Sequence, residues 1–256
     1  MRIKKIKSIL LAIIISITLV SAQKSPSYPQ PPTLVTVPTA GVLPGSSYMV
    51  DLNLYHSGGV ATGVEIGLTN RLMIGVSYSA TNVIGNRKVE WGLRPEAMIK
   101  YRIFEETAAM PAFLIGFDSR GRGAYIDSLD QGRYEMKAKG LYLAISRNFH
   151  FLGNLGIHGG VNYNPIEDLH DDDVSFYLGI DKDINNEITL MVEYDAALND
   201  NATNEITLDK GYLNAGIRWL MFEHFHFEID FRDILMNRNE IESCEREITL
   251  HYVDFF

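Results

Sequence analysis

The sequence predicts an all-β protein: a single antiparallel transmembrane β-barrel of about twelve strands, closing on a C-terminal strand that ends at Phe256. Apolar side chains recur at every second position through most of the chain, and short connectors alternate with longer ones between these runs. Bacterial outer-membrane barrels combine both features, because their strands turn apolar side chains to lipid and polar ones inward, and because their periplasmic turns are shorter than their outer loops.

The first 22 residues have the parts of a secretory signal peptide. Four basic residues precede an apolar core from Ile9 to Val20, and small residues form a cleavage site at Val20-Ser21-Ala22. The core is too short to span a bilayer as a helix, and no other stretch approaches the roughly eighteen apolar residues that a span needs. We therefore expect cleavage near Ala22 and a place in the bacterial outer membrane.

Residues 23–46 are predicted to be a Pro-rich leader, and residues 47–256 the barrel. Six of the nine prolines lie between Pro26 and Pro44, among Ser, Thr and Gln. Such a composition favours an extended chain. Two positions remain open for this leader: loose in the periplasm, or folded into the mouth of the barrel.

The charge balance is acidic, with 23 Lys and Arg against 32 Asp and Glu. Loss of the signal peptide removes four basic residues and no acidic ones, which leaves a net charge of about −13. Nucleic acid is therefore not an expected partner. Cys244 is the only cysteine, so no internal disulfide can form.

The strands follow from the two-residue period. Val60 to Leu68 and Leu72 to Tyr78 both alternate, and only Asn70 and Arg71 stand between these two strands, as in a tight hairpin. The same reading predicts strands at 48–56, 60–69, 72–80, 91–102, 111–118, 139–148, 155–163, 174–182, 187–195, 211–219, 224–232 and 246–256. Twelve is an even number, as single-chain bacterial barrels require.

The connectors give an independent argument for a membrane barrel. Those at 70–71, 103–110, 149–154, 183–186 and 220–223 are short, and those at 81–90, 119–138, 164–173, 196–210 and 233–245 are longer. Only 57–59 departs from the alternation. A soluble β-barrel has no reason to alternate in this way.

The last strand is predicted to turn Ile248, Leu250, Tyr252 and Phe256 to lipid and Thr249, His251 and Val253 inward. It resembles the closing strand of outer-membrane proteins, and this resemblance implies that Tyr252 and Phe256 are the signal read by the barrel-assembly machinery. Aromatic residues near other strand ends fit an interfacial girdle, namely Trp91, Tyr101, Phe113, Phe117, Tyr163, Tyr194 and Trp219.

Charged side chains fall on the opposite face of the strands. They are Glu65, Arg94, Glu96, Lys100, Arg102, Glu193, Asp195, Arg218, Glu228, Asp230 and Arg232. A basic side chain facing mid-bilayer hydrocarbon costs about 2–4 kcal/mol, so we expect these residues to line the lumen. Because both signs are present, a plugged or very narrow lumen is favoured over an open aqueous channel.

Candidate chemical sites are weak, and no catalytic residue, cofactor or metal is predicted. The acidic loop of Glu167, Asp168, His170 and Asp171 to Asp173 has no EF-hand spacing and is interpreted as solvated surface. His56-Ser57 could suggest a lipase pair, and His224 with His226 a metal site, but each lacks its further partners. Arg120 and Arg122 are candidate contacts for an anionic glycan or lipopolysaccharide.

Several stretches resemble the YjbH-type family of outer-membrane proteins, which is linked to exopolysaccharide production. The resemblance covers about residues 38 to 163 and is carried by Pro38-Thr39-Ala40 with Gly45, Lys100-Tyr101-Arg102 with Glu105-Glu106, the run Pro111 to Asp118, Gly121 to Tyr125, and Gly140 to Arg147. It implies a role in moving or anchoring secreted polysaccharide, with no catalytic residues.

The sequence thus leads to a non-enzymatic outer-membrane barrel that assists export or retention of surface exopolysaccharide. A narrow porin or solute channel is the first alternative, and an outer-membrane protease or lipase the second. Expected partners are outer-membrane lipid and lipopolysaccharide, the barrel-assembly machinery, and polysaccharide or its export proteins.

Overall fold

The computed structural model describes residues 31–256 except 127–131, 151, 168–170, 172, 202–206 and 240. The predicted signal peptide and its cleavage site, the first residues of the leader, and Asp168, His170 and Asp172 of the acidic loop lie outside this range. Among the described residues, no helix is long and apolar enough to cross a bilayer.

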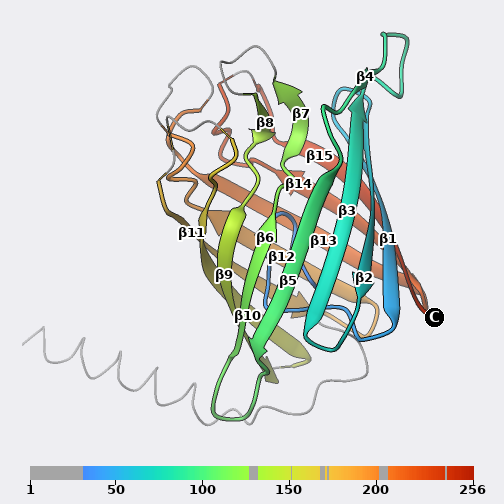
Figure 1. Ribbon diagram of the computed structural model, residues 1–256, viewed down its shortest axis with the longest axis vertical. Helices are drawn as coiled ribbons and strands as arrows, with labels where there is room; N and C mark the ends of the chain where they lie inside the picture. Colours follow the sequence, from blue (N-terminus) through green and yellow to red (C-terminus); the bar gives the residue numbers. More distant parts are fainter. Residues whose placement is uncertain are drawn as a thin grey trace, which may run out of the picture.

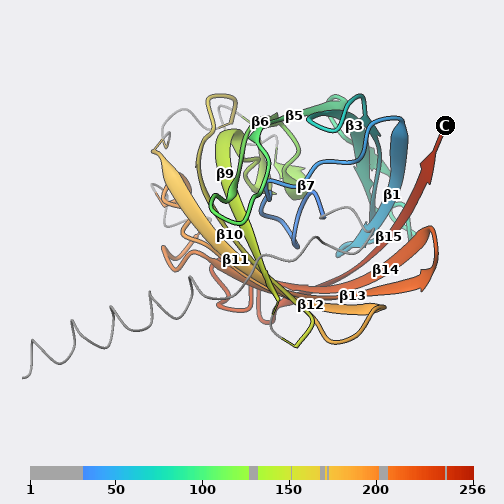
Figure 2. The same cartoon turned by 90° about the horizontal axis from the view of Figure 1, so that it is seen from below.

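The predicted twelve-strand antiparallel barrel is confirmed (Figures 1 and 2). β1 pairs with both β2 and β15, which closes the sheet on itself. The ring consists of β1 (Ser47–Tyr55), β2 (Gly59–Gly67), β3 (Leu72–Thr81), β5 (Glu96–Phe104), β6 (Ala112–Asp118), β9 (Gly140–His150), β10 (Asn154–Tyr163), β11 (Ser175–Asp183), β12 (Ile188–Asp195), β13 (Tyr212–Phe222), β14 (Phe225–Arg232) and β15 (Glu245–Phe255).

Three short strands were not predicted. β4 (Glu90–Trp91) pairs with β3 outside the ring, and β7 (Arg122–Ile126) pairs with β8 (Arg133–Met136) in a hairpin within the connector 119–138. The predicted strand at 91–102 begins only at Glu96. Pro95 explains that boundary, because proline cannot donate to a ladder of hydrogen bonds. β7 and β8 are too short to show a two-residue apolar period.

The two faces of each strand divide as expected of a barrel that spans a membrane. On β11, Phe176, Leu178 and Ile180 are exposed outward, whereas Tyr177 and Asp181, at alternate positions, are buried. The same alternation continues around the ring and gives a broad exposed apolar band. In water such a band would be an aggregation surface, whereas hydrocarbon solvates it.

The closing strand has the predicted orientation. Ile248 and Leu250 are exposed, and Thr249 is buried. The ring of Phe256 stacks on the ring of Tyr48 of β1, with 6.4 Å between the ring centroids. The ring centroid of Tyr252 lies 6.2 Å from that of Tyr48. The first and last strands are therefore joined by side chains as well as by their ladder.

Inside the barrel lies a hairpin formed by the described part of the leader. Residues 32–43, which we call the plug, turn back on themselves through the bonds from Leu34 N to Val37 O (3.0 Å) and from Thr39 N to Pro32 O (3.0 Å). Figure 2 shows this segment within the ring. Of the two positions left open for the leader, the structure has these residues in the lumen.

The plug supplies much of the apolar core. Its tip residues Leu34, Val35 and Val37 pack with Tyr177 and Met191 of the wall. Its base packs in a second cluster that contains Ala40, Val42, Leu43, Met49, Met73, Met98, Ala112, Leu114, Tyr142 and Ala144. Since the outer face of the strands is left to lipid, many of the buried apolar contacts lie between plug and wall. A smaller cluster without plug residues consists of Met136, Ala197 and Tyr212.

Candidate functional site

The inner wall of the barrel is strongly acidic. Among the charged side chains that described strand residues bury in the ring, the acids are Glu65, Glu96, Asp181, Glu193, Asp195, Glu228, Asp230, Glu245 and Glu247, and the bases are Lys100, Arg218 and Arg232. Burial of so many carboxylates requires partners that neutralise them or donate hydrogen bonds.

Most of the charged residues expected in the lumen belong to this inner wall, and two do not. The Arg94 side chain is 43% exposed in the connector before β5, where its Nε lies 3.2 Å from a Glu96 oxygen. Arg102 is half-buried near the end of β5 that carries the short turns, and it donates to the Asn70 carbonyl at 2.7 Å. Both stand near strand ends, where alternation no longer dictates which way a side chain points.

Asp181, Glu245 and Glu247 were missed from the sequence. Asp181 shares its strand face with the buried Tyr177, and Glu245 and Glu247 share theirs with the buried Thr249. The two-residue period on β11 and β15 could have identified all three as inward-facing.

Glu193 binds the tip of the plug. Its carboxylate accepts hydrogen bonds from the backbone N–H groups of Val35 (2.9 Å), Thr36 (2.8 Å) and Val37 (3.2 Å), and from the Thr36 hydroxyl (2.6 Å). The Asn214 amide donates a further bond at 2.8 Å. Consecutive N–H groups that converge on one carboxylate form an anion-binding nest, in which the plug supplies the donors and the wall supplies the anion.

Two cations of the inner wall bind plug carbonyls. Lys100 Nζ donates to the carbonyls of Pro32 and Thr39, and Arg218 donates to those of Thr33 (3.2 Å) and Leu34 (3.4 Å). The wall thus satisfies both kinds of backbone group in the hairpin. A buried peptide segment without such partners would be costly.

Glycines in the wall make room for the plug tip. A Cβ added to Gly179 would lie 2.3 Å from Leu34 Cδ1, and one added to Gly216 would lie 3.0 Å from Val35 Cγ2. Both distances are below ordinary van der Waals contact. The absence of a side chain at these positions therefore permits the close approach of the tip to β11 and β13.

A second set of contacts joins the connectors to the inner wall at the end of the barrel with the longer loops. Arg120 lies 2.5 Å from Glu65 and 3.0 Å from Asp118, Lys139 pairs with Asp195, and Arg238 pairs with Glu245. These cations come from outside the strands. They neutralise part of the acidic inner wall and draw the connectors, including the β7–β8 hairpin, over the mouth.

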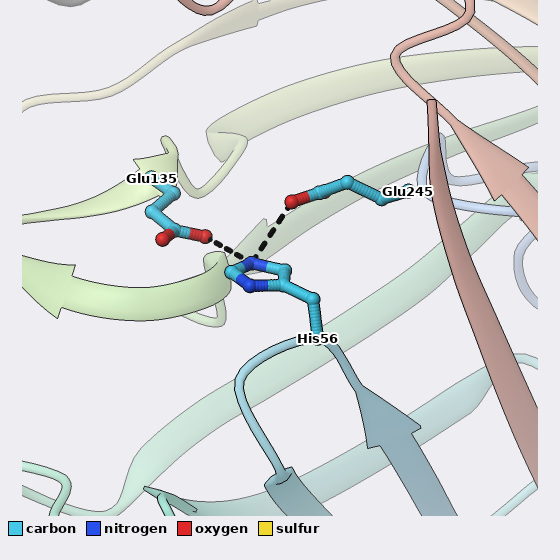
Figure 3. Close-up of side chains that lie close together, drawn as sticks. All are labelled: His56, Glu135 and Glu245. Carbon is cyan, nitrogen blue, oxygen red and sulfur yellow. Dashed lines mark hydrogen bonds and ion pairs between the residues drawn. The ribbon is translucent and has the colours of Figure 1, made fainter. Parts of the chain in front are cut away.

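His56 lies at the centre of one such contact (Figure 3). Its Nε2 is 2.6 Å from Glu135 of β8 and 2.9 Å from Glu245 of β15. Burial lowers the pKa of His56, but the hydrogen bonds and charges of Glu135 and Glu245 outweigh it and raise this pKa to about 9. The imidazolium therefore ties the β1–β2 turn, the β7–β8 hairpin and the rim of β15 together at neutral pH.

The same three residues have ligand atoms within 4.8 Å of one another, as a metal site would. Arg238, however, pairs with Glu135 at 2.7 Å and also with Glu245. A metal ion would have to displace this guanidinium and the proton on His56. The cluster is therefore best described as a network of ion pairs.

The suggested lipase pair lies in this network. Ser57 Oγ is 3.1 Å from His56 Nδ1. An imidazole that is protonated at neutral pH cannot accept the serine proton, so this contact does not make Ser57 a nucleophile.

The two histidines considered as a metal site, His224 and His226, lie where β14 begins. His224 Nδ1 lies 2.9 Å from the Val253 carbonyl, and His226 is opposite His251 in the β14–β15 ladder.

The acidic loop differs from its prediction. Glu167 is buried and accepts bonds from the N–H groups of Tyr134 (3.2 Å) and Ala138 (2.7 Å), and Asp171 is buried and accepts one from Asn201 N–H (2.6 Å). The interpretation as solvated surface is wrong for both residues, because they cap the backbone of neighbouring connectors. Burial raises the pKa of Glu167 despite these bonds.

Comparison with known proteins does not assign this chain to a family. No family model matches the chain, and no curated protein matches it. Similar solved structures include the KdgM porin, with a TM-score of 0.49 and 7% identity over 82% of this chain and 99% of that chain. The NanC porin has a TM-score of 0.44 and 12% identity, also over 82% of this chain and 99% of that chain. A third is the translocator domain of the autotransporter NalP from Neisseria meningitidis, with a TM-score of 0.36 and 10% identity over 82% of this chain and 86% of that chain. The resemblance to the YjbH-type family is not shown by these comparisons.

The class of protein follows from the chain's own geometry. A closed antiparallel ring, an exposed apolar band and a charged interior define a membrane-spanning β-barrel protein. Its distinguishing feature is the plug that Glu193, Lys100 and Arg218 hold in the lumen.

Proposed function

We propose that this protein is a non-enzymatic outer-membrane channel of narrow lumen, closed in its resting state by its own plug. The observation that carries the proposal is the bonding of the plug tip to Glu193, because this contact is formed inside the lumen and is itself buried. It joins two parts of the chain that a passing solute would have to separate.

Two small cavities lie at the mouth beside the connectors. One cavity of about 10 Å³ lies beside Lys139, Asp195 and Asn199, and another of about 40 Å³ lies beside Asp51, Glu96 and Arg122. A cavity needs about 10–15 Å³ to hold one water, so these have room for about one and about three waters. Neither of these two cavities has room for a hydrated ion or a sugar, which agrees with a closed state.

Recordings in planar bilayers test the proposal. We expect the intact protein to give no steady conductance, and a variant lacking residues 31–43 to give stable openings. A heat-dependent shift on gel electrophoresis serves as the control that both barrels are folded. Large, stable, voltage-independent channels from the intact protein would establish an open porin and overturn the plugged state.

Assembly in the outer membrane belongs to the same proposal. Phe256 is 75% exposed and Tyr252 half-buried at the end of the closing strand, where the barrel-assembly machinery could reach both. Lipid and lipopolysaccharide would surround the apolar band. Fractionation of the protein with soluble periplasmic proteins would contradict this location.

A role in export or retention of surface exopolysaccharide remains a second hypothesis, based on the resemblance over residues 38–163. Of the two candidate glycan contacts, Arg120 is engaged by Glu65 and Asp118, and Arg122 lines the larger cavity at the mouth. The hypothesis predicts that deleting the gene changes the amount or attachment of surface polysaccharide. An unchanged polysaccharide profile would remove it and leave the channel.

A further inference from the structure

We infer that the lumen, once the plug leaves it, passes cations in preference to anions. This inference rests on the proposed channel function and names the class of solute. It follows from three observations: the charges of the inner wall, the ion pairs that some of these charges form within the wall, and the N–H groups by which the plug balances an acid that has no such ion pair.

Two of the three bases of the inner wall are already paired within it. Arg218 is bound to Glu228, and Arg232 lies 3.0 Å from Glu245 and also contacts Glu247. Each of these guanidiniums therefore has its charge balanced by neighbours in the same sheet. Lys100 is the exception, because it binds plug carbonyls and loses them when the plug leaves. Its single positive charge is outnumbered by two acids, Glu193 and Asp230.

Two acids of the inner wall, Glu193 and Asp230, lie beside the plug tip, and neither forms an ion pair among the described residues. Glu193 takes its donors from the plug and from Asn214. Asp230 is 3% exposed, and its Oδ1 has no hydrogen-bond partner. A Cβ added to Gly216 would meet both this Oδ1 atom, at 2.3 Å, and Val35 of the plug, at 3.0 Å, which places the unpaired oxygen beside the tip.

The plug occupies the position of a cation in the closed state. Its three N–H groups present partial positive charge to Glu193, as a helix N-terminus does to a phosphate. When the plug leaves, water takes the place of its tip beside Glu193 and Asp230. Two carboxylates then face a narrow passage with low-dielectric walls, which concentrates cations and repels anions.

The loop cations do not reverse this balance. Arg120, Lys139 and Arg238 each pair with an acid of the inner wall near the mouth. Their charge is therefore offset at the rim. The uncompensated acids lie deeper, beside the plug tip, where the passage selects what crosses.

The experiment measures the reversal potential of open barrels in a KCl gradient across a planar bilayer. One open form is the variant lacking residues 31–43. The other is the full-length Gly179→Val variant, in which the new side chain collides with Leu34 and drives the tip out while every charge is kept. We expect K⁺ to be several-fold more permeant than Cl⁻ in both.

Removal of the two acids should abolish the preference. Adding Glu193→Gln and Asp230→Asn to an open form is expected to bring the permeability ratio close to one. Adding Glu247→Gln, a matched loss of a buried carboxylate whose cation partner stays in the inner wall, should change the ratio less. Conducting barrels that favour Cl⁻, or that show no preference, would overturn the inference and leave the channel intact.

A different result would remove the proposed function itself. If both open forms show a heat-dependent gel shift, and so are folded, yet conduct no current, the barrel is not a channel and the inference fails with it. The two failures are thereby distinguished by whether current flows at all.

Discussion

Replacing Glu193 by alanine should release the plug. In the closed state the carboxylate accepts bonds from three plug N–H groups and from the Thr36 hydroxyl. Glu193→Ala removes the acceptor and leaves three buried donors without partners unless the tip leaves the wall. The substitution therefore penalises the closed state, because in the open state water satisfies the same N–H groups.

The size of the effect follows from the number of bonds. A buried donor left unsatisfied costs about 1–3 kcal/mol, so three of them at the lower limit cost about 3 kcal/mol. Since each 1.4 kcal/mol corresponds to a factor of ten, the ratio of open to closed barrels should rise roughly 100-fold. Lys100 and Arg218 still bind plug carbonyls, so part of the population stays closed.

Two assays report this change. Planar-bilayer recordings should show openings in Glu193→Ala that the parent protein lacks. Thiol labelling provides an independent measure: Val37 is fully buried, so Val37→Cys in a Cys244→Ser background should react slowly in the parent and much faster when Glu193→Ala is added. Cys244 must be removed first because it is a free, partly exposed thiol.

Glu247→Ala is the matched control. Glu247 is a buried carboxylate of the inner wall that binds Arg232 and Asn53, with no hydrogen bond to the plug. It should leave both labelling and conductance near the parent values. If Glu193→Ala behaves like this control while still shifting on heating, Glu193 does not hold the plug and the reasoning is refuted.

Three further outcomes are expected. Leu250→Arg, on the lipid face, should cost up to about 2–4 kcal/mol near mid-membrane and abolish the heat-dependent gel shift, whereas Leu152→Arg in an exposed turn should preserve it. The contact of the His56 imidazolium with Glu135 contributes its full stabilisation below about pH 6.5 and loses it as pH rises through about 9, the raised pKa of His56. Tryptic cleavage at Arg133 should therefore increase above pH 9, and His56→Gln should show no such increase. Gly179→Ala should increase the labelling of Val37→Cys less than Gly179→Val does, because the short contact of a single methyl group is with the flexible end of Leu34, at 2.3 Å, and its next contact, Glu193 Cβ, lies at 3.3 Å.

The strands and their two faces were predictable because alternation is a local property. Successive side chains on a strand point to opposite sides, so apolar residues at every second position identify the lipid face without any knowledge of the partners. For the same reason Glu193, Arg218 and Asp230 could be assigned inward. Arg94 could not, because it precedes Pro95 in a connector, where no strand period applies.

The contacts at the mouth lay beyond the reach of the sequence. Glu135, His56 and Glu245 come from three separate elements, and Arg238 joins them from a fourth. The acidic composition of the loop at Glu167 predicted a solvated surface, yet that carboxylate caps backbone N–H groups of a neighbouring connector. Composition does not record which donors lie close by in space.

The sequence by itself determined that this chain forms a membrane barrel with a charged interior, because the covalent geometry of strands and the cost of burying charge in lipid act on each segment separately. Only the tertiary structure decided that the lumen is closed. The bonds that close it join Glu193 to residues more than 150 positions earlier in the chain. They depend on ring closure, which brings β12 and the leader together, and no local pattern in Pro-rich residues 31–46 encodes that meeting.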